Sequence, residues 1–165
     1  MKNGVILLGS ARGNGYTAQL AQATGLPVLD LADFDISPFD YRHLNRGDDF
    51  LPLVRQLLGY RRIHFASPVY WYCMSAQMKI FFDRLSDLLK IEKALGRQLR
   101  GKQAGVLATG GGPAPACFEE VFRRSFGYLG MHYEGMIYLD TSQGLDGRAL
   151  QAAVRDYQAL LSPTE

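Results

Sequence analysis

The chain has 165 residues, a length that suits one domain and excludes a two-domain dehydrogenase or kinase. Hydrophobic residues make up 47% of the sequence and charged residues 21%, which is typical of a folded globular protein and excludes a disordered or fibrous one. The formal net charge of +2 is too small to direct the molecule to nucleic acid or to an anionic membrane, so small-molecule partners are favoured.

Neither cysteines nor targeting segments point to an extracellular or membrane protein. Cys73 and Cys117 are the only two cysteines, and they lack CxxC or metal-ligand spacing, so the sequence predicts no disulfide framework, zinc site or iron–sulfur site. The apolar run at residues 4–8 is too short for a signal peptide, and no apolar stretch is long enough to span a membrane. We therefore expect a cytoplasmic protein without membrane contacts.

The first part of the chain predicts two strands and two helices in alternation. Residues 5–8 are a short apolar run, a helical segment begins near Thr17, and residues 27–31 return as a second strand. Asp48 or Asp49 can then cap a helix. One face of that helix is expected to be buried and to hold Leu53, Val54, Leu57 and Leu58.

The strongest helix prediction follows the third strand, which we expect at residues 63–68. Ser75 is a suitable N-cap, and apolar residues then recur at intervals of three and four, the spacing of one buried helical stripe. The stripe is expected to contain Met78, Phe81, Phe82, Leu85, Leu88 and Leu89.

The rest of the chain completes five strand–helix units. It supplies strands at 103–108 and 136–139, a helix at 118–129 that stops at Gly127 or Gly130, and a final helix at 150–161. Strands covered by helices on both faces form a parallel sheet with right-handed crossovers. The sequence therefore predicts an α/β fold: one domain, residues 1–165, with a flavodoxin-like, doubly wound, five-stranded parallel sheet of order 2-1-3-4-5.

Ligands of such sheets bind beyond the carboxyl ends of the strands, near the switch point between strands one and three. The loop after strand one, residues 9–17, reads GSARGNGYT. Its glycine amides, the hydroxyls of Ser10 and Thr17, and the charge of Arg12 can all bind a phosphate. A glycine-rich turn capped by Thr17 is the alternative. A nucleoside-triphosphatase loop is not favoured, because the GK[ST] sequence is missing.

A dinucleotide-binding dehydrogenase is a weaker interpretation of the same loop. Gly9, Gly13 and Gly15 match the glycine spacing of short-chain dehydrogenases, and Gly13, Gly15 and Ala18 match G-x-G-x-x-A. However, none of the nine tyrosines has a lysine four residues later, so the catalytic pair of those enzymes is missing. The chain is also shorter than they are.

The loops after strands three and four add an aromatic wall and free amides. Residues 67–75 read SPVYWYCMS, and three consecutive rings are more than one core can take, so a flat ligand or a second subunit is expected to cover some of them. Residues 109–115 read TGGGPAP, which offers backbone amides to the edge of a heterocycle, or forms a plain tight turn. Together the three loops suit a mononucleotide with a flat tricyclic ring, which describes FMN.

The chain resembles the NAD(P)H-dependent FMN reductase family over most of its length. GSARGNGYT, SPVYWYCMSAQMKIFFDR at residues 67–84 and ATGGG at 108–112 carry the resemblance, with a weaker match in GYLGMHYEG at 127–135. Departures are Cys73, where a small polar residue is common, and Arg61, Arg62 and His64 in strand three. The resemblance implies that FMN phosphate binds to Ser10, Arg12, Asn14, Gly15, Tyr16 and Thr17. It places Pro68, Val69, Tyr70, Trp71, Met74, Thr109, Gly110 and Gly111 near the ring.

Other residues with possible chemistry are expected to be structural. The three histidines, His43, His64 and His132, have no partner at catalytic or metal-binding spacing. Cys73 is expected to be inert, with redox activity as the alternative. The basic residues of segment 79–102 are expected to be a solvated surface, or else to meet the extra phosphate of NADPH; the candidates are Lys90, Lys93, Arg97 and Arg100.

The expected function is an FMN-dependent oxidoreductase that passes hydride from NADPH or NADH through the flavin to a small acceptor. Quinones, azo and nitro compounds and free flavin are the candidate acceptors, and no protein acid or base is required. The alternatives are a flavodoxin-like electron carrier, which the net charge of +2 disfavours, or a flavin-binding module. Exposed rings also predict a homodimer or homotetramer.

Overall fold

Residues 2–161, the part of the chain that the computed structural model describes, form a five-stranded sheet in which every neighbouring pair is parallel. The strand order β2-β1-β3-β4-β5 confirms the predicted doubly wound order. The strands are β1 (Lys2–Leu8), β2 (Val28–Asp30), β3 (Tyr60–Pro68), β4 (Gln103–Gly110) and β5 (His132–Asp140). The helices are α1 (Tyr16–Ala23), α2 (Phe50–Leu58), α3 (Ala76–Lys90), α4 (Lys93–Arg97), α5 (Ala116–Leu129) and α6 (Gly147–Leu161), with a 3-10 helix η1 (Leu31–Asp33).

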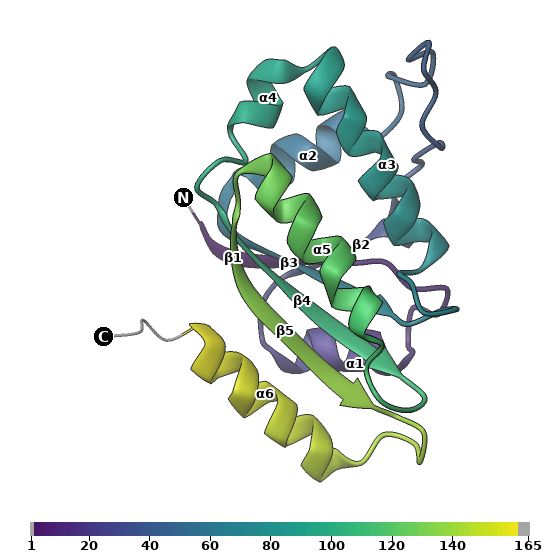
Figure 1. The fold of residues 1–165 in the computed structure, drawn as a ribbon, viewed down its shortest axis with the longest axis vertical. Coiled ribbons are helices and arrows are strands. Elements are labelled where there is room, and N and C mark those ends of the chain that lie inside the picture. Colours follow the sequence, from purple (N-terminus) through teal and green to yellow (C-terminus); the bar gives the residue numbers. More distant parts are fainter. Residues whose placement is uncertain (1, 162–165) are drawn as a thin grey trace.

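Helices cover both faces of the sheet (Figure 1): α1 and α6 lie on one face, and α2, α3 and α5 lie on the other. Strand β1 serves both layers, because successive side chains of a strand point to opposite faces. Val5 and Leu7 pack in the core under α2, α3 and α5, whereas Ile6 and Leu8 pack in the core under α1 and α6. No helix within residues 2–161 is long and apolar enough to cross a membrane.

Helix ends largely follow the predicted signals. Ser75 caps α3, since its Oγ accepts a hydrogen bond from Met78 N at 3.2 Å. Gly130, and not Gly127, ends α5, because the C-cap residue adopts the left-handed conformation (φ 73°) that glycine tolerates. At α2, Asp49 occupies the N-cap position, but the neighbouring Asp48 supplies the carboxylate that accepts from Phe50 N at 3.1 Å.

Several predicted details were wrong. Strand β2 ends at Asp30, because the Asp30 carboxylate accepts from Ala32 N and starts η1. Strand β5 starts at His132, four residues earlier than expected. Leu89 does not belong to the buried stripe of α3: its side chain is 37% exposed and borders a hollow between α3 and α5. Helix α4 and η1 were not predicted, because segments this short have no complete hydrophobic period.

A buried ion-pair network ties the long connection between β2 and α2 to helix α3. Arg84 is fully buried and donates to Asp48 at 2.5 Å, to Asp87 at 2.9 Å and to the carbonyl of Ser37 at 3.0 Å. Asp87 also contacts His43 Nδ1 at 2.8 Å. These contacts support the structural role expected of His43, although the carboxylate partner is 44 positions away in the sequence.

Candidate functional site

The three loops predicted to form the site lie together at the carboxyl ends of β1, β3 and β4. Thr17 Oγ1 and Thr109 Oγ1 share a buried hydrogen bond of 2.6 Å, which joins the start of α1 to the end of β4. Val69 N donates to the carbonyl of Thr109 at 2.8 Å and thus joins the loop after β3 to the same residue. Ser75 Oγ donates to the carbonyl of Gly9 at 2.7 Å. The loops therefore form one continuous surface at the switch point of the sheet.

The loop after β1 leads into a helix N-terminus that no side chain caps. Gly15 is the N-cap residue of α1 and has no side chain to offer. Within residues 2–161, the backbone amides of Tyr16 and Thr17 have no hydrogen-bond partner. Arg12 is exposed, and its carbonyl accepts from Gly15 N at 3.3 Å. Free amides, the positive end of a helix dipole and a guanidinium together suit a phosphate group.

The other residues predicted to bind phosphate differ in exposure. Ser10 and Thr17 are buried, and Ser10 Oγ accepts from Arg12 N at 3.2 Å, so these two hydroxyls shape the loop. Asn14 and Tyr16 are exposed at its outer side. A ligand at the helix N-terminus would therefore meet backbone amides and Arg12 first.

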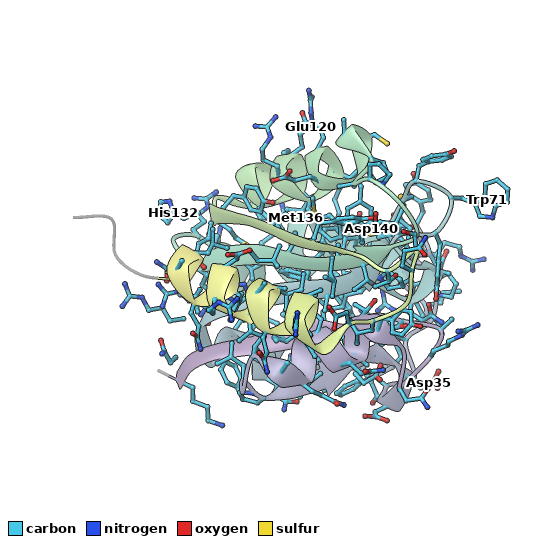
Figure 2. All side chains as sticks on the ribbon, turned by 90° about the horizontal axis from the view of Figure 1, so that it is seen from below. Asp35, Trp71, Glu120, His132, Met136 and Asp140 are labelled. Carbon is cyan, nitrogen blue, oxygen red and sulfur yellow. The ribbon has the colours of Figure 1, made fainter. Side chains whose placement is uncertain are left out.

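The loop after β3 forms a tight turn with two aromatic residues in the left-handed region. Tyr70 and Cys73 exchange two backbone hydrogen bonds of 2.9 and 3.0 Å, while Trp71 and Tyr72 have φ angles of 49° and 65°. Such angles cost a non-glycine residue about 1–2 kcal/mol and concentrate at functional sites. Trp71 is 93% exposed and projects beyond the body of the molecule (Figure 2).

A cavity of about 270 Å³ lies between this aromatic turn and the loop after β4. It brings together four of the residues that the resemblance placed near the ring, namely Val69, Trp71, Gly110 and Gly111. Met74 is not among them: it is buried and borders the hollow between α3 and α5. Of the remaining lining residues, Tyr72, Pro113 and Pro115 belong to the two loops that were predicted but were not named as contacts, and Tyr138 lies outside them.

Hydrogen bonds hold the loop after β4 so that one peptide group stays free. The carbonyl of Gly110 accepts from Thr141 N at 2.8 Å, and the carbonyl of Gly112 accepts from Tyr138 Oη at 2.6 Å. Gly112 N donates to Asp140 Oδ1 at 3.0 Å. The amide of Gly111 has no partner within residues 2–161, so it can donate to a ligand in the cavity.

Residues at the end of β5 are therefore part of the site, although the sequence analysis missed them. Burial raises the pKa of Tyr138, so its hydroxyl remains a donor at neutral pH. Hydrogen bonds from the backbone and side chain of Ser142 and from the amide of Gly112 lower the pKa of Asp140, so its carboxylate remains an acceptor. Their position at the carboxyl end of the strand next to β4 was the one sequence signal that could have found them.

The four basic residues considered for the NADPH phosphate lie toward the opposite end of the sheet. Lys93, Arg97 and Arg100 precede the first residue of β4, whereas the site follows its last residue. The eight residues of β4 separate these two ends by roughly 23 Å at the usual rise of a strand. These side chains therefore lie far from the site of the same chain, and their contact with the extra phosphate of NADPH stays a prediction.

A comparison with known proteins shows the family to which this geometry belongs. Residues 1–143 match the family model of NADPH-dependent FMN reductases. The chain belongs to the NADPH-dependent FMN reductase family. One relative, YwqN of Bacillus subtilis (strain 168), is named as an NAD(P)H-dependent FMN-containing oxidoreductase; it is 29% identical over 174 residues, which cover 94% of this chain and 91% of YwqN.

Solved structures show the same fold as this FMN reductase family member. The Trp repressor binding protein from Bacillus subtilis has a TM-score of 0.75 at 23% identity. The match covers 98% of the present chain and 100% of the Bacillus subtilis chain. An FMN-dependent NADH-azoreductase from Bacillus anthracis, solved in complex with FMN, has a TM-score of 0.70 at 11% identity. The match covers 97% of the present chain and 98% of the azoreductase chain. The predicted flavodoxin-like fold is confirmed.

The residues present fit the cofactor of the FMN reductase family. The unpartnered amides at the start of α1 and the nearby guanidinium of Arg12 suit the phosphate. The cavity, with aromatic side chains on one wall and the free amide of Gly111 on the other, suits a flat heterocycle with polar edges. Both halves of FMN thus have a matching set of donors at one end of the sheet.

Proposed function

We propose that the protein uses FMN to take hydride from NADPH or NADH and to reduce a small acceptor, such as a quinone, an azo or nitro compound or free flavin. The observation that carries this proposal is that an uncapped helix N-terminus and an aromatic, glycine-walled cavity occur at the same end of the sheet. When bound, FMN supplies the hydride and electron chemistry, so the chain needs no side-chain acid or base.

Each loop has a separate role in this proposal. The loop after β1 binds the phosphate through Ser10, Arg12, Asn14, Gly15, Tyr16 and Thr17. The loop after β3 supplies the wall of the ring site through Val69, Tyr70 and Trp71, while Pro68 and Met74 of the same segment are buried and do not line the cavity. The loop after β4 aims the free amide of Gly111 at the polar edge of the ring, where it favours developing negative charge, and Gly110 adds no side chain beside it.

The open aromatic wall supports a flat acceptor. Trp71 is almost fully exposed at the mouth of the cavity, where it can contact a second planar molecule. Two solved structures of the same fold are named as an NADPH-quinone reductase from P. pentosaceus, with a TM-score of 0.70, and an NADH-azoreductase from Bacillus anthracis. We extend these acceptor classes to the present chain as part of the proposal.

An anaerobic titration tests the proposal. Purified protein is saturated with FMN, and NADPH or NADH is added while the visible flavin band is followed. We expect one FMN per chain and bleaching within seconds, followed by recovery of the band when a quinone is added. Slow bleaching would favour the electron-carrier alternative, and a protein that does not quench FMN fluorescence would contradict the proposal altogether.

A further inference from the structure

The only two cysteines of the chain lie close to each other beside the cavity. Cys73 closes the aromatic turn, and Cys117 lies in the first turn of α5, just after the cavity-lining Pro115. Cys117 Sγ donates to the carbonyl of Tyr72 at 3.6 Å, and Tyr72 is the residue directly before Cys73. Nothing in the sequence spacing indicated this proximity.

Peptide geometry limits the distance between the Cys117 sulfur and the backbone of Cys73. A carbonyl oxygen lies about 2.8 Å from the next Cα across a trans peptide. Since Cys117 Sγ is 3.6 Å from the Tyr72 carbonyl, it lies within about 6.4 Å of the Cys73 Cα atom. A cysteine Sγ lies about 2.8 Å from its own Cα, so the two Cα atoms are within about 9.2 Å of each other. A disulfide needs them about 4.4–6.8 Å apart, so the turn has to approach α5 by at most a few ångströms to join the cysteines.

The turn that carries Cys73 is suited to such a shift. Trp71 and Tyr72 are in the left-handed region, and both side chains are exposed, so little packing holds the tip of the turn. Cys117 is also exposed and can meet an oxidant directly, whereas Cys73 is half-buried and packs against the core. The two thiols therefore differ in access, as an attacking and a resolving cysteine would.

We propose that Cys73 and Cys117 form a reversible disulfide that joins the aromatic turn to α5 at the mouth of the cavity. Cys117 Sγ attacks hydrogen peroxide, which breaks the O–O bond and leaves a sulfenic acid and one water. Cys73 Sγ then attacks that sulfur, the S–S bond forms, the S–O bond breaks, and a second water leaves. The two thiols lose two electrons and two protons, and the peroxide takes them up. A dithiol reverses the reaction by exchange and is itself oxidised.

The bond would connect opposite walls of the cavity. Tyr72 and Pro115 both line it, and each is close in sequence to one of the cysteines. Joining them fixes the position of Trp71 and Tyr72 and narrows the entrance for a second substrate. This consequence rests on the proposed function, whereas formation of the bond does not.

The bond is tested directly on the full chain. Protein without and with FMN is treated with hydrogen peroxide, and free thiols are counted with a thiol reagent after denaturation. We expect the oxidised protein to remain a single chain, to lose both free thiols and to lose the mass of two hydrogen atoms. Residues 73 and 117 should then occur in one cross-linked peptide, and dithiothreitol should restore both thiols. In Cys73→Ser, we expect a sulfenic acid on Cys117 that dimedone traps, and Cys117→Ser should lose the cross-link and leave Cys73 largely reduced.

Other outcomes would overturn the proposal. These are a disulfide between two chains, the absence of any cross-link, or equal oxidation of the remaining thiol in both single variants. The effect on the cavity is measured separately, as the rate of flavin bleaching by NADPH before and after peroxide. We expect a several-fold decrease in the parent that dithiothreitol reverses, and no response to peroxide in Cys73→Ser. If NADPH bleaches the flavin band in neither protein, the proposed function is contradicted. The disulfide is still tested separately by the thiol counts and the cross-linked peptide.

Discussion

Arg12 is the only charged residue between Gly9 and Thr17, and it lies beside the uncapped start of α1. If FMN phosphate binds there, Arg12→Ala removes a charge-assisted hydrogen bond. We expect FMN affinity to fall about ten- to a hundredfold, measured by fluorescence titration, while circular dichroism shows an unchanged fold.

Riboflavin provides the matched control, because it has the ring but no phosphate. Its affinity should hardly change in Arg12→Ala, whereas Trp71→Ala should weaken riboflavin and FMN alike through lost stacking. Equal losses of the two ligands in Arg12→Ala would show that the loop after β1 does not bind phosphate.

His64 is a buried histidine without a hydrogen-bond partner on either ring nitrogen within residues 2–161. Burial, and to a lesser extent the charge of Arg62, lower the pKa of His64 to about 4. The carboxylate of Glu134 would favour the charged form, but it is 3.7 Å away, beyond hydrogen-bond distance, and it already accepts from Arg62. Burial therefore dominates, and His64 is neutral in the folded protein at pH 7.

This pKa makes the protein less stable in mild acid. Between pH 6.5 and 4 the unfolded chain binds a proton at His64 that the folded chain does not, so stability rises with pH and is lost as pH falls. From pH 7.5 to pH 5, we expect His64 to account for a loss of about 2 kcal/mol in the free energy of unfolding. Urea unfolding of the parent and of His64→Gln at both pH values measures this loss, and an equal pH dependence of the two proteins would contradict it.

At the scale of elements, the end of β5 positions the loop after β4. Tyr138 Oη donates to Gly112, and a Cβ atom placed on Gly110 would lie only 2.5 Å from the same hydroxyl oxygen. The glycine at position 110 thus allows a contact that sets the shape of the loop. Without this contact the free amide of Gly111 would lose its fixed direction.

We expect Tyr138→Phe to lower FMN affinity about three- to tenfold, because one hydrogen bond contributes about 1 kcal/mol to the order of the loop. Tyr157→Phe is the matched control: the Tyr157 hydroxyl is buried under α6 and has no hydrogen-bond partner within residues 2–161. Titration with FMN compares the two variants. An equal effect of both substitutions would show that Tyr138 does not act through the loop.

For the whole molecule, exposed apolar surface predicts self-association. A hollow of about 410 Å³ lies between α3 and α5, and Leu89, Val121 and Tyr128 are exposed around it. Trp71 and Tyr72 add a second exposed apolar area. We expect a homodimer, or a homotetramer, since patches of this kind are usually covered by another subunit.

Light scattering at working concentration should give at least twice the mass of one chain. Tyr128→Ser should weaken association, whereas Tyr41→Ser, which removes an equally exposed ring from the connection between β2 and α2, should leave the mass unchanged. A single-chain mass for the parent protein would contradict the prediction. The assignment of residues 1–165 to a single domain likewise stays a prediction.

Local sequence signals were enough to predict the fold class and to select the loops of the candidate site. Alternating apolar runs and helical periods are local signals, and Ser75 and Gly130 mark helix ends because capping depends on a few adjacent residues. Once five strand–helix units are recognised, the handedness of crossovers leaves few topologies, and the switch point follows. The loops after β1, β3 and β4 could therefore be selected in advance.

Which distant residues meet could not be predicted from the sequence. The contacts of Tyr138 with Gly112, of Cys117 with Tyr72 and of Arg84 with Asp48 join segments that are 26, 45 and 36 positions apart. Such contacts depend on strand register and helix packing, which no short stretch of sequence encodes. The aromatic turn is a second example, because the sequence indicates only that three aromatic residues follow β3. The folded backbone shows in addition that Trp71 and Tyr72 are held in a strained turn at the mouth of a cavity.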